Sequence, residues 1–135
     1  MPFDPTQIHW LPVLVVTLAG FMLGGVWYGP LFGKAWMAAL GKREEDIRPT
    51  PLPFVISFVS AAGTAIGIAL LVAALNLATL ASGLVLGALV GVLFIAAAMA
   101  SDSAFCGTGL PLFLIQAGYR VVYSLLMGGV LAVWR

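Results

Sequence analysis

The residue best placed to do chemistry in this sequence is Arg120. It lies within residues 113–130, FLIQAGYRVVYSLLMGGV, and is the one charged residue of that run. A guanidinium group stays ionised at any pH a protein meets, so the run carries a permanent positive charge. Such a group can bind an anion or a carboxylate, or it can hold neighbouring helices together.

Polar residues recur at three- and four-residue spacing around this arginine, and on a helix that spacing places them on one face. The face, which we call the polar stripe, consists of Gln116, Tyr119, Arg120, Tyr123 and Ser124. The opposite face carries Leu114, Val121, Val122, Leu125 and Leu126. The pattern predicts a helix with one polar and one lipid-facing side, and makes the polar stripe a candidate binding surface.

Three interpretations of Arg120 are open from the sequence. It binds a mobile anion, a lipid headgroup or a carboxylate substrate, as charged residues inside membranes often do. Alternatively it is structural and is fixed by Asp102, Gln116, tyrosine hydroxyls or helix-end carbonyls. In the third, the span is shifted and the guanidinium reaches the membrane surface. Asp102 is a partner only if residues 101–111 fold inward.

Composition indicates a chain that dissolves in lipid. Of 135 residues, 62% are hydrophobic and 8% are charged, and the mean hydropathy is +1.12. A soluble domain carries about a quarter charged residues, so this chain could not cover a globular surface. A net charge of +1 provides no basic field for nucleic acid. The single cysteine, Cys106, excludes an internal disulfide and a multi-thiolate metal site.

Four segments, at about residues 10–28, 53–75, 79–100 and 110–134, are long enough to cross the ~30 Å hydrocarbon core of a bilayer. They lack the period-two alternation of a membrane barrel and must be helices. We therefore predict an all-α, integral membrane four-helix bundle in which residues 1–135 form one transmembrane domain. Arg120 then lies roughly 15 Å deep, near the midplane, at a cost of about 2.5–3.5 kcal/mol.

The first and third connections carry the features that the spans lack. Gly29-Pro30 is expected to end the first helix. Residues 32–40 then have the pattern of a short amphipathic helix, which lies in the headgroup plane or packs on the end of the bundle. The acidic run 44–46 resembles a metal-ligand cluster, but consecutive helical carboxylates diverge, so a solvated face is the better interpretation. Residues 101–111 are expected to form an exposed loop or a loop that dips into the bundle.

Basic residues predict the orientation. The first connection holds Lys34, Lys42, Arg43 and Arg48, whereas the other side of the membrane holds only Arg135. The positive-inside rule puts the first connection in the cytoplasm and both termini outside. The expected location is the inner membrane of a bacterium.

Small residues at four-residue spacing predict where helices approach closely. Gly83, Gly87 and Gly91 form the strongest such series, and Gly63 and Gly67 form a second pair. The sequence leaves open whether these contacts lie within one chain or between chains. Four short glycine-rich helices offer more packing surface than one bundle uses, so a homo-oligomer is expected.

The residues of known catalytic sites are missing from the sequence. It contains one His and one Cys, which the predicted topology puts on opposite sides of the membrane, and it shows no HExxH, CxxC or phosphate-binding loop. None of the four spans carries a carboxylate, which argues against a drug/proton antiporter. We expect no enzymatic activity, no cofactor and no metal.

Two stretches carry a family resemblance. The block HWLPVLVVTLAGFMLGGVWYGPLFGKAW with the following ALGKREED, and LIQAGYRVVYSLLMGGVLAVW near the end, resemble a bacterial family of small four-span membrane proteins, the domain of unknown function numbered 1761. The resemblance implies an integral bacterial membrane protein of four helices, and it implies no activity and no functional residues.

Two functional hypotheses follow. The first is a structural or accessory protein that packs with itself or with a larger complex. The second is a small transporter or channel for an anionic or amphipathic solute, lined by the polar stripe. The partners expected are the lipid bilayer, further copies of the chain, and a lipid or anionic ligand near Arg120.

Overall fold

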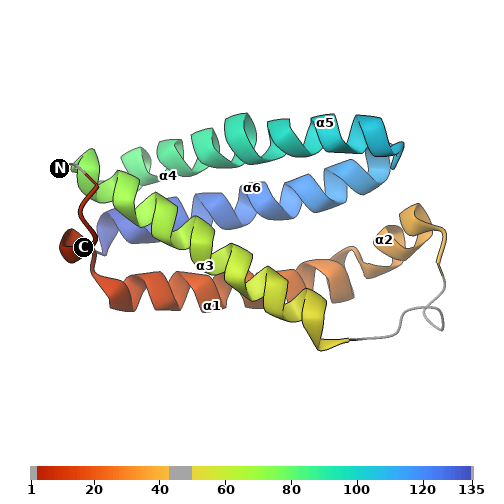
Figure 1. The fold of residues 1–135 in the computed structure, drawn as a ribbon, viewed down its shortest axis with the longest axis horizontal. Helices are drawn as coiled ribbons and strands as arrows, with labels where there is room; N and C mark the ends of the chain where they lie inside the picture. The colour runs from red at the N-terminus through yellow and green to blue at the C-terminus, as the bar shows by residue number, and fades with distance from the viewer. Residues whose placement is uncertain (1–2, 43–49, 135) are drawn as a thin grey trace.

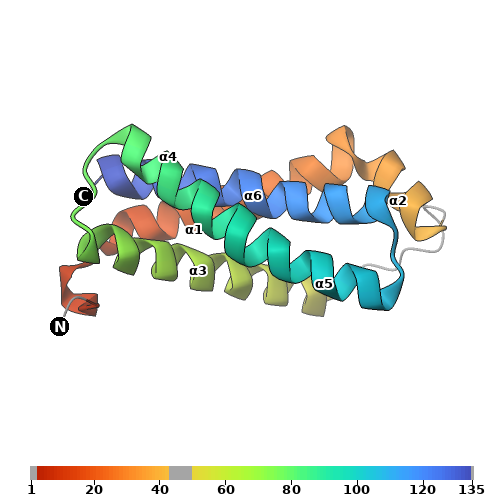
Figure 2. The same ribbon diagram turned by 90° about the horizontal axis from the view of Figure 1, so that it is seen from above.

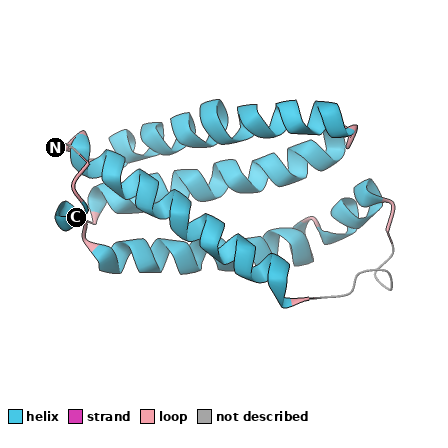
Figure 3. Cartoon of the chain, in the orientation of Figure 1, coloured by secondary structure: helices cyan, strands magenta, loops and turns pink. Residues whose placement is uncertain are grey.

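A computed structural model describes residues 3–42 and 50–134, and within these residues the chain is a bundle of helices without strands (Figures 1 and 3). The predicted all-α four-helix bundle is confirmed. The elements are η1 (Pro5–Gln7), α1 (Trp10–Val26), η2 (Trp27–Leu31), α2 (Gly33–Leu40), α3 (Pro51–Ala74), α4 (Leu80–Ala88), η4 (Leu89–Ala96), α5 (Ala97–Cys106) and α6 (Leu110–Val133).

Four continuous helical stretches are long and apolar enough to cross a membrane. They are Trp10–Leu31, Pro51–Ala74, Leu80–Cys106 and Leu110–Val133, of 22, 24, 27 and 24 residues. Their outward faces carry large apolar side chains, with Met22, Val85 and Phe105 exposed by 70%, 67% and 91%. Their length and composition suggest a multi-pass membrane protein.

Successive long helices run in opposite directions, so the bundle has two distinct ends (Figures 1 and 2). Both termini lie at one, which we call the terminal end. The helix α2 and the turn between α5 and α6 lie at the other, which we call the connection end. The most extensive contact of the bundle is between α4 and α6.

The first long helix continues through Pro30, contrary to the expectation that Gly29-Pro30 ends it. Residues Trp27–Leu31 form a π-helical turn, in which the N–H of Phe32 donates to the carbonyl of Trp27 at 2.9 Å. A π-turn pairs residues five apart and is wider than an α-turn. Proline lacks a backbone N–H, so it has no hydrogen bond to give up in this turn. The wider turn accommodates it, and the helix ends only after Leu31.

The third long helix is also longer than predicted. Residues 101–106 form neither an exposed nor a re-entrant loop, because α4, η4 and α5 run on continuously to Cys106. Gly107 ends the helix with a left-handed φ of 68°, a conformation that glycine adopts without strain. Only residues 107–109 are left to reverse the chain before α6.

The amphipathic segment forms a helix close to where it was expected. It begins at Gly33, where a side chain would collide with the carbonyl oxygen of Tyr28, and ends at Gly41. The ring of Trp36 packs edge-on against Tyr28, with centroids 5.2 Å apart. The contact holds α2 against the connection end of the bundle, and its place in the headgroup plane stays a prediction.

The bundle is packed tightly along only half of its length. Buried residues on α1 end at Gly20, those on α3 begin at Ala61, and the last buried residue of the third long helix is Gly91. All three limits lie near the middle of the bundle. The terminal half therefore contains most of the core, whereas α3 and α5 diverge toward the connection end (Figure 1). We call this second part the open half.

Candidate functional site

The helix α6 places Arg120 near the middle of the bundle. Arg120 follows Leu110 by ten positions and precedes Val133 by 13, which correspond to roughly 15 Å and 20 Å of helix. Tyr119, Tyr123 and Ser124 are buried, whereas Gln116 and Arg120 are half-buried. The polar stripe thus crosses from the packed terminal half into the open half.

Two tyrosine rings hold the guanidinium group. Its central carbon lies 5.3 Å from the ring centre of Tyr119 and 5.4 Å from that of Tyr123, which is cation–π distance. Nη1 of Arg120 also donates to the hydroxyl oxygen of Tyr123 at 3.0 Å. The cation is therefore fixed in position by neutral groups.

A hydrogen-bonded chain carries this contact to α3. The Tyr123 hydroxyl lies 3.2 Å from the Thr64 hydroxyl, which in turn donates to the carbonyl of Ser60 at 2.9 Å. Because the Thr64 hydroxyl uses its proton on Ser60, the Tyr123 hydroxyl is left to donate to Thr64. The Tyr123 oxygen is then free to accept from Arg120.

Tyr119 connects the site to α1. Its hydroxyl donates to the carbonyl of Gly20 at 2.7 Å, and its ring meets the ring of Tyr28 edge-on at 5.6 Å. A side chain at Gly24 would press on that hydroxyl at 3.0 Å, so the small residue admits the tyrosine. The three tyrosines form a cluster that closes one side of Arg120.

Ser124 is part of the stripe by spacing, but its hydroxyl bonds within α6. It donates to the carbonyl of Arg120 at 2.7 Å. Ser124 is also fully buried, where its side chain lies against Gly91 of the third long helix. It contributes to helix packing and offers no free donor to a ligand.

Asp102 does not neutralise Arg120. It is exposed on α5, and within the described residues Arg120 forms no ion pair. Gly91 lies against Val121 and Ser124, so the antiparallel register places Asp102 roughly 13 Å beyond the level of Arg120. The two groups are at different depths.

The π-helical segment η4 also directs the Asp102 carboxylate away from the face that packs on α6. Asp102 follows Gly91 by 11 residues. In an unbroken α-helix this distance is three turns, so the two residues would lie on the same face. The wider turns of Leu89–Ala96 rotate the rest of the helix. Ala100, Ser103 and Gly107 face α6 instead.

Gln116 and Arg120, both half-buried, retain donors without hydrogen-bond partners among the described residues, on the open side of the polar stripe. A guanidinium has five N–H donors, and those of Arg120 show one hydrogen bond in the described part of the chain. The Gln116 amide shows none there. Both residues lie on the same face of α6 as Phe113, three and seven positions after it.

The glycines predicted to pack fall into two groups. Side chains added at Gly83, Gly87 and Gly91 would collide with α6, the first two with the backbone of Gly128 and Ser124. These glycines allow the close α4–α6 contact. A side chain added at Gly63 or Gly67 would meet nothing within 4 Å, so that pair makes no close helix contact within the chain.

Several residues of the site could not be identified from the sequence. Gly20 comes from α1, Tyr28 from η2 and Thr64 from α3, and no local pattern connects them with a helix that begins at Leu110. Trp27 likewise ties η2 to α6 through a 2.8 Å hydrogen bond from its Nε1 to the carbonyl of Ile115. In the sequence, Thr64 was distinguished only as a small residue one helical turn after Ser60.

A groove of about 480 Å³ lies between α5 and the start of α6, in the open half. Its walls are formed by Ala100, Ser103, Ala104, Gly107, Gly109, Leu110 and Phe113. Most of these side chains are small or absent, so the two helices leave space between them. Among the lining residues, Phe113 is the one nearest in the sequence to Gln116 and Arg120.

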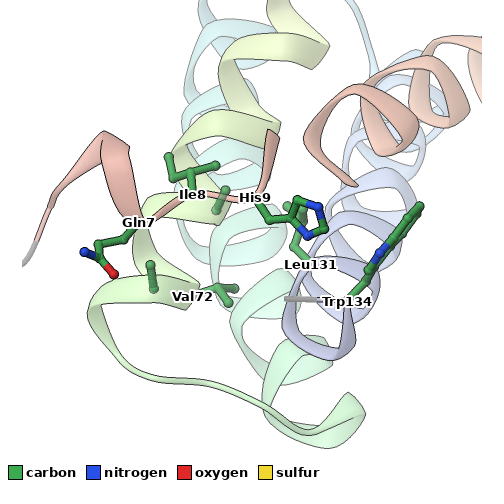
Figure 4. A pocket seen from close by; sticks show the side chains of 8 residues that line it. Gln7, Ile8, His9, Val72, Leu131 and Trp134 are labelled. Carbon is green, nitrogen blue, oxygen red and sulfur yellow. The ribbon is translucent and has the colours of Figure 1, made fainter. Parts of the chain in front are cut away.

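A smaller cavity of about 40 Å³ lies at the terminal end (Figure 4). His9 and Trp134 border it, with ring centres 6.3 Å apart, and Ile8 and Leu131 contribute apolar walls. Nearby, hydrogen bonds from the hydroxyl and backbone N–H of Thr6 lower the pKa of the Asp4 carboxyl. The cavity is too small and too apolar to indicate a ligand.

Metal-ligand groups do not gather in the described residues, where no three His, Cys, Asp or Glu side chains lie together. The acidic run 44–46 lies outside those residues. His9 lies at the terminal end and Cys106 at the connection end.

Comparison with known proteins places the chain in a family. No curated protein and no solved structure matches it. The family model described as "Protein of unknown function (DUF1761)" matches residues 11–132, which cover the four long helices except for Trp10 and Val133 at the two ends. The predicted resemblance is confirmed, and the chain belongs to the DUF1761 family.

Proposed function

We propose that this protein is an accessory protein of the bacterial inner membrane that assembles with other membrane helices and performs no chemistry itself. The observation that carries the proposal is the unequal packing of the bundle. Gln116 and Arg120 are half-buried and face the open half of the bundle. In that half, the described residues of α5 include no buried one. In lipid, polar groups at this depth need protein or trapped water beside them.

Self-association is part of the proposal. On α3, Ser60 and Gly67 are half-buried and Gly63 is exposed, and the two glycines have no neighbour within 4 Å of an added Cβ. Small residues at this spacing let a helix of another copy approach closely. The α3 face around Gly63 and Gly67 is therefore the proposed contact between copies.

Crosslinking and native mass spectrometry in mild detergent test this contact. Gly63→Leu should convert oligomers to monomers without loss of the helical content, because the added side chain has room within one chain. Ala98→Leu, on the exposed outer side of α5, is the matched control and should leave the oligomers intact. A wild-type protein that is monomeric throughout would refute self-association.

The proposed orientation has the first connection in the cytoplasm and both termini outside. Four basic residues in that connection against Arg135 alone at the other end support it. Both termini lie at one end of the bundle, as the orientation requires (Figure 1).

A second candidate function, passage of an anionic or amphipathic solute, is favoured by one observation. Arg120 is half-buried and retains unpaired donors in the described structure, so an anion could contact it. Flux of labelled organic anions into proteoliposomes tests this function. Flux that Arg120→Gln abolishes would support it, and flux no higher than in protein-free vesicles would exclude it.

A further inference from the structure

We infer that the open half is a docking site for a transmembrane helix of a different protein, one that carries a carboxylate side chain near the middle of its span. The inference deepens the proposed accessory function and rests on it. Its central observation is that Arg120 keeps unpaired donors in the described structure, on the same face of α6 as Phe113, which lines the groove between α5 and α6.

The charge of Arg120 defines the chemistry of the occupant. The cation–π contacts and the Tyr123 hydroxyl fix the guanidinium, and no carboxylate of residues 3–42 and 50–134 neutralises its charge. A carboxylate can accept two parallel hydrogen bonds from the free donors, which is the strongest pairing a guanidinium makes. The neighbouring Gln116 amide could donate a third hydrogen bond to the same group.

A second copy of this chain cannot supply that carboxylate. The five acidic residues of the sequence are Asp4, Asp102 and those of the run 44–46, and none lies in the middle of the four long helices found among residues 3–42 and 50–134. A second copy in the same orientation would carry Asp102 at the depth of the first copy's Asp102, roughly 13 Å from the level of Arg120. The acidic partner is therefore a different polypeptide.

The depth of Arg120 favours a helix over a lipid headgroup. The guanidinium lies near the middle of α6, roughly 15 Å from its start. The headgroups of the bilayer lie at the edge of a hydrocarbon core ~30 Å thick. A transmembrane helix brings a side chain to the midplane without deforming the bilayer, whereas a phospholipid would have to leave its leaflet.

The groove has the surface that helix packing requires. Ala100, Ser103, Ala104 and Gly107 recur at three- and four-residue spacing along its α5 wall. Small residues of this kind let helix backbones approach closely. At the connection end α3 and α5 lie apart (Figure 1). The occupant thus packs on α5 with its carboxylate against Arg120.

Synthetic single-span helices test the inference. The full-length protein is placed in phosphatidylcholine vesicles, and binding of a labelled leucine-alanine peptide with one central Glu is measured by energy transfer. The matched peptide carries Gln in place of Glu. The Glu peptide should bind tighter by about tenfold or more, because it alone forms a charge-assisted pair. Acidification, which protonates the carboxylate, should remove the difference.

Variants of the protein separate charge from shape. Arg120→Gln should abolish the preference for the Glu peptide. Ala104→Leu should weaken both peptides, because the larger side chain fills the groove. Ala98→Leu, on the side of α5 away from the groove, should change neither. Equal binding of the two peptides, or a preference for Glu that survives Arg120→Gln, would overturn the inference.

A lipid occupant gives a different result. In vesicles containing phosphatidylglycerol, native mass spectrometry would show retained anionic lipid that is lost in Arg120→Gln, without preference between the peptides. That outcome would also overturn the inference and assign the site to a headgroup. If the peptides fail while Gly63→Leu still breaks oligomers, the proposed accessory function stands and only the acidic partner is rejected.

Discussion

At the residue scale, Arg120 shows how a cation near the middle of a long apolar helix is held by neutral groups in the described part of the chain. For a membrane-spanning helix, inserting a guanidinium near the midplane costs about 2.5–3.5 kcal/mol. Two cation–π contacts of about 0.5–2 kcal/mol each and one hydrogen bond of about 1 kcal/mol oppose that cost. These terms nearly cancel, so Arg120 adds little net stability to the isolated chain, and its free donors remain available to a partner.

Arg120→Gln should accordingly change the free energy of unfolding of the isolated protein by less than about 1 kcal/mol, because the cost and the contacts are removed together. Reversible unfolding in lipid bicelles, followed by circular dichroism, measures it. A loss above about 3 kcal/mol would instead show that the guanidinium is an anchor of the fold.

The Tyr119 hydroxyl should contribute more than that of Tyr28. Tyr119→Phe removes the 2.7 Å bond to the Gly20 carbonyl, which should cost about 1 kcal/mol, within the range of interhelical hydrogen bonds in membranes. Tyr28→Phe is the control, since the Tyr28 hydroxyl forms no hydrogen bond within residues 3–42 and 50–134. It should change stability by less than about 0.5 kcal/mol. Equal effects of the two variants would contradict this assignment.

At the element scale, the third long helix divides into two parts with different partners. Gly83, Gly87 and Gly91 pack it against α6, and the π-helical segment η4, Leu89–Ala96, rotates the faces of the helix that follows. Beyond that segment Ala100 and Gly107 border a groove where the earlier glycines border a backbone. The third long helix thus packs tightly on α6 in the terminal half and borders a groove in the open half.

Gly87→Ala should destabilise the protein by about 1–3 kcal/mol, because the new methyl group collides with the backbone of Ser124, which cannot rotate away. Gly63→Ala is the matched control. It adds a methyl group in open space and should stabilise α3 by up to about 1 kcal/mol, since alanine favours the helix. Both are measured by unfolding of detergent-solubilised monomer, so that α3 contacts between copies do not contribute. Equal destabilisation by the two substitutions would refute the packing described for α4 and α6.

At the scale of the whole molecule, the two ends of the bundle differ in packing and in the groups they carry. The terminal end is closed by packing, whereas the connection end carries α2, the groove and the single cysteine. The partner proposed above would approach Arg120 between helices that diverge toward the connection end. If the orientation proposed above is right, this half faces the cytoplasmic leaflet.

Cys106 allows that orientation to be measured directly, because it is exposed and is the only cysteine of the chain. A membrane-impermeant maleimide should label it in inverted vesicles and not in intact spheroplasts. Thr6→Cys in a Cys106→Ser background should show the opposite pattern, because Thr6 is at the other end of the bundle. Labelling of Cys106 in spheroplasts would reverse the proposed topology.

The sequence by itself determined the helices of this protein and the polar face of the last one. The length of the apolar runs predicted four long helices, and the three- and four-residue spacing predicted the polar stripe of α6. Both are properties of a single helix, and the period of a helix is fixed by its own backbone. The same reasoning failed at Pro30 and at residues 101–106, where π-turns and continued helix replaced the expected breaks.

Only the tertiary structure decided which residues meet. It placed Tyr28, Gly20 and Thr64 around Arg120, kept Asp102 away from it, and left Gly63 and Gly67 without a neighbour in the chain. These outcomes depend on the register and rotation of one helix against another. A single π-helical segment alters both, and no local sequence pattern specifies the result.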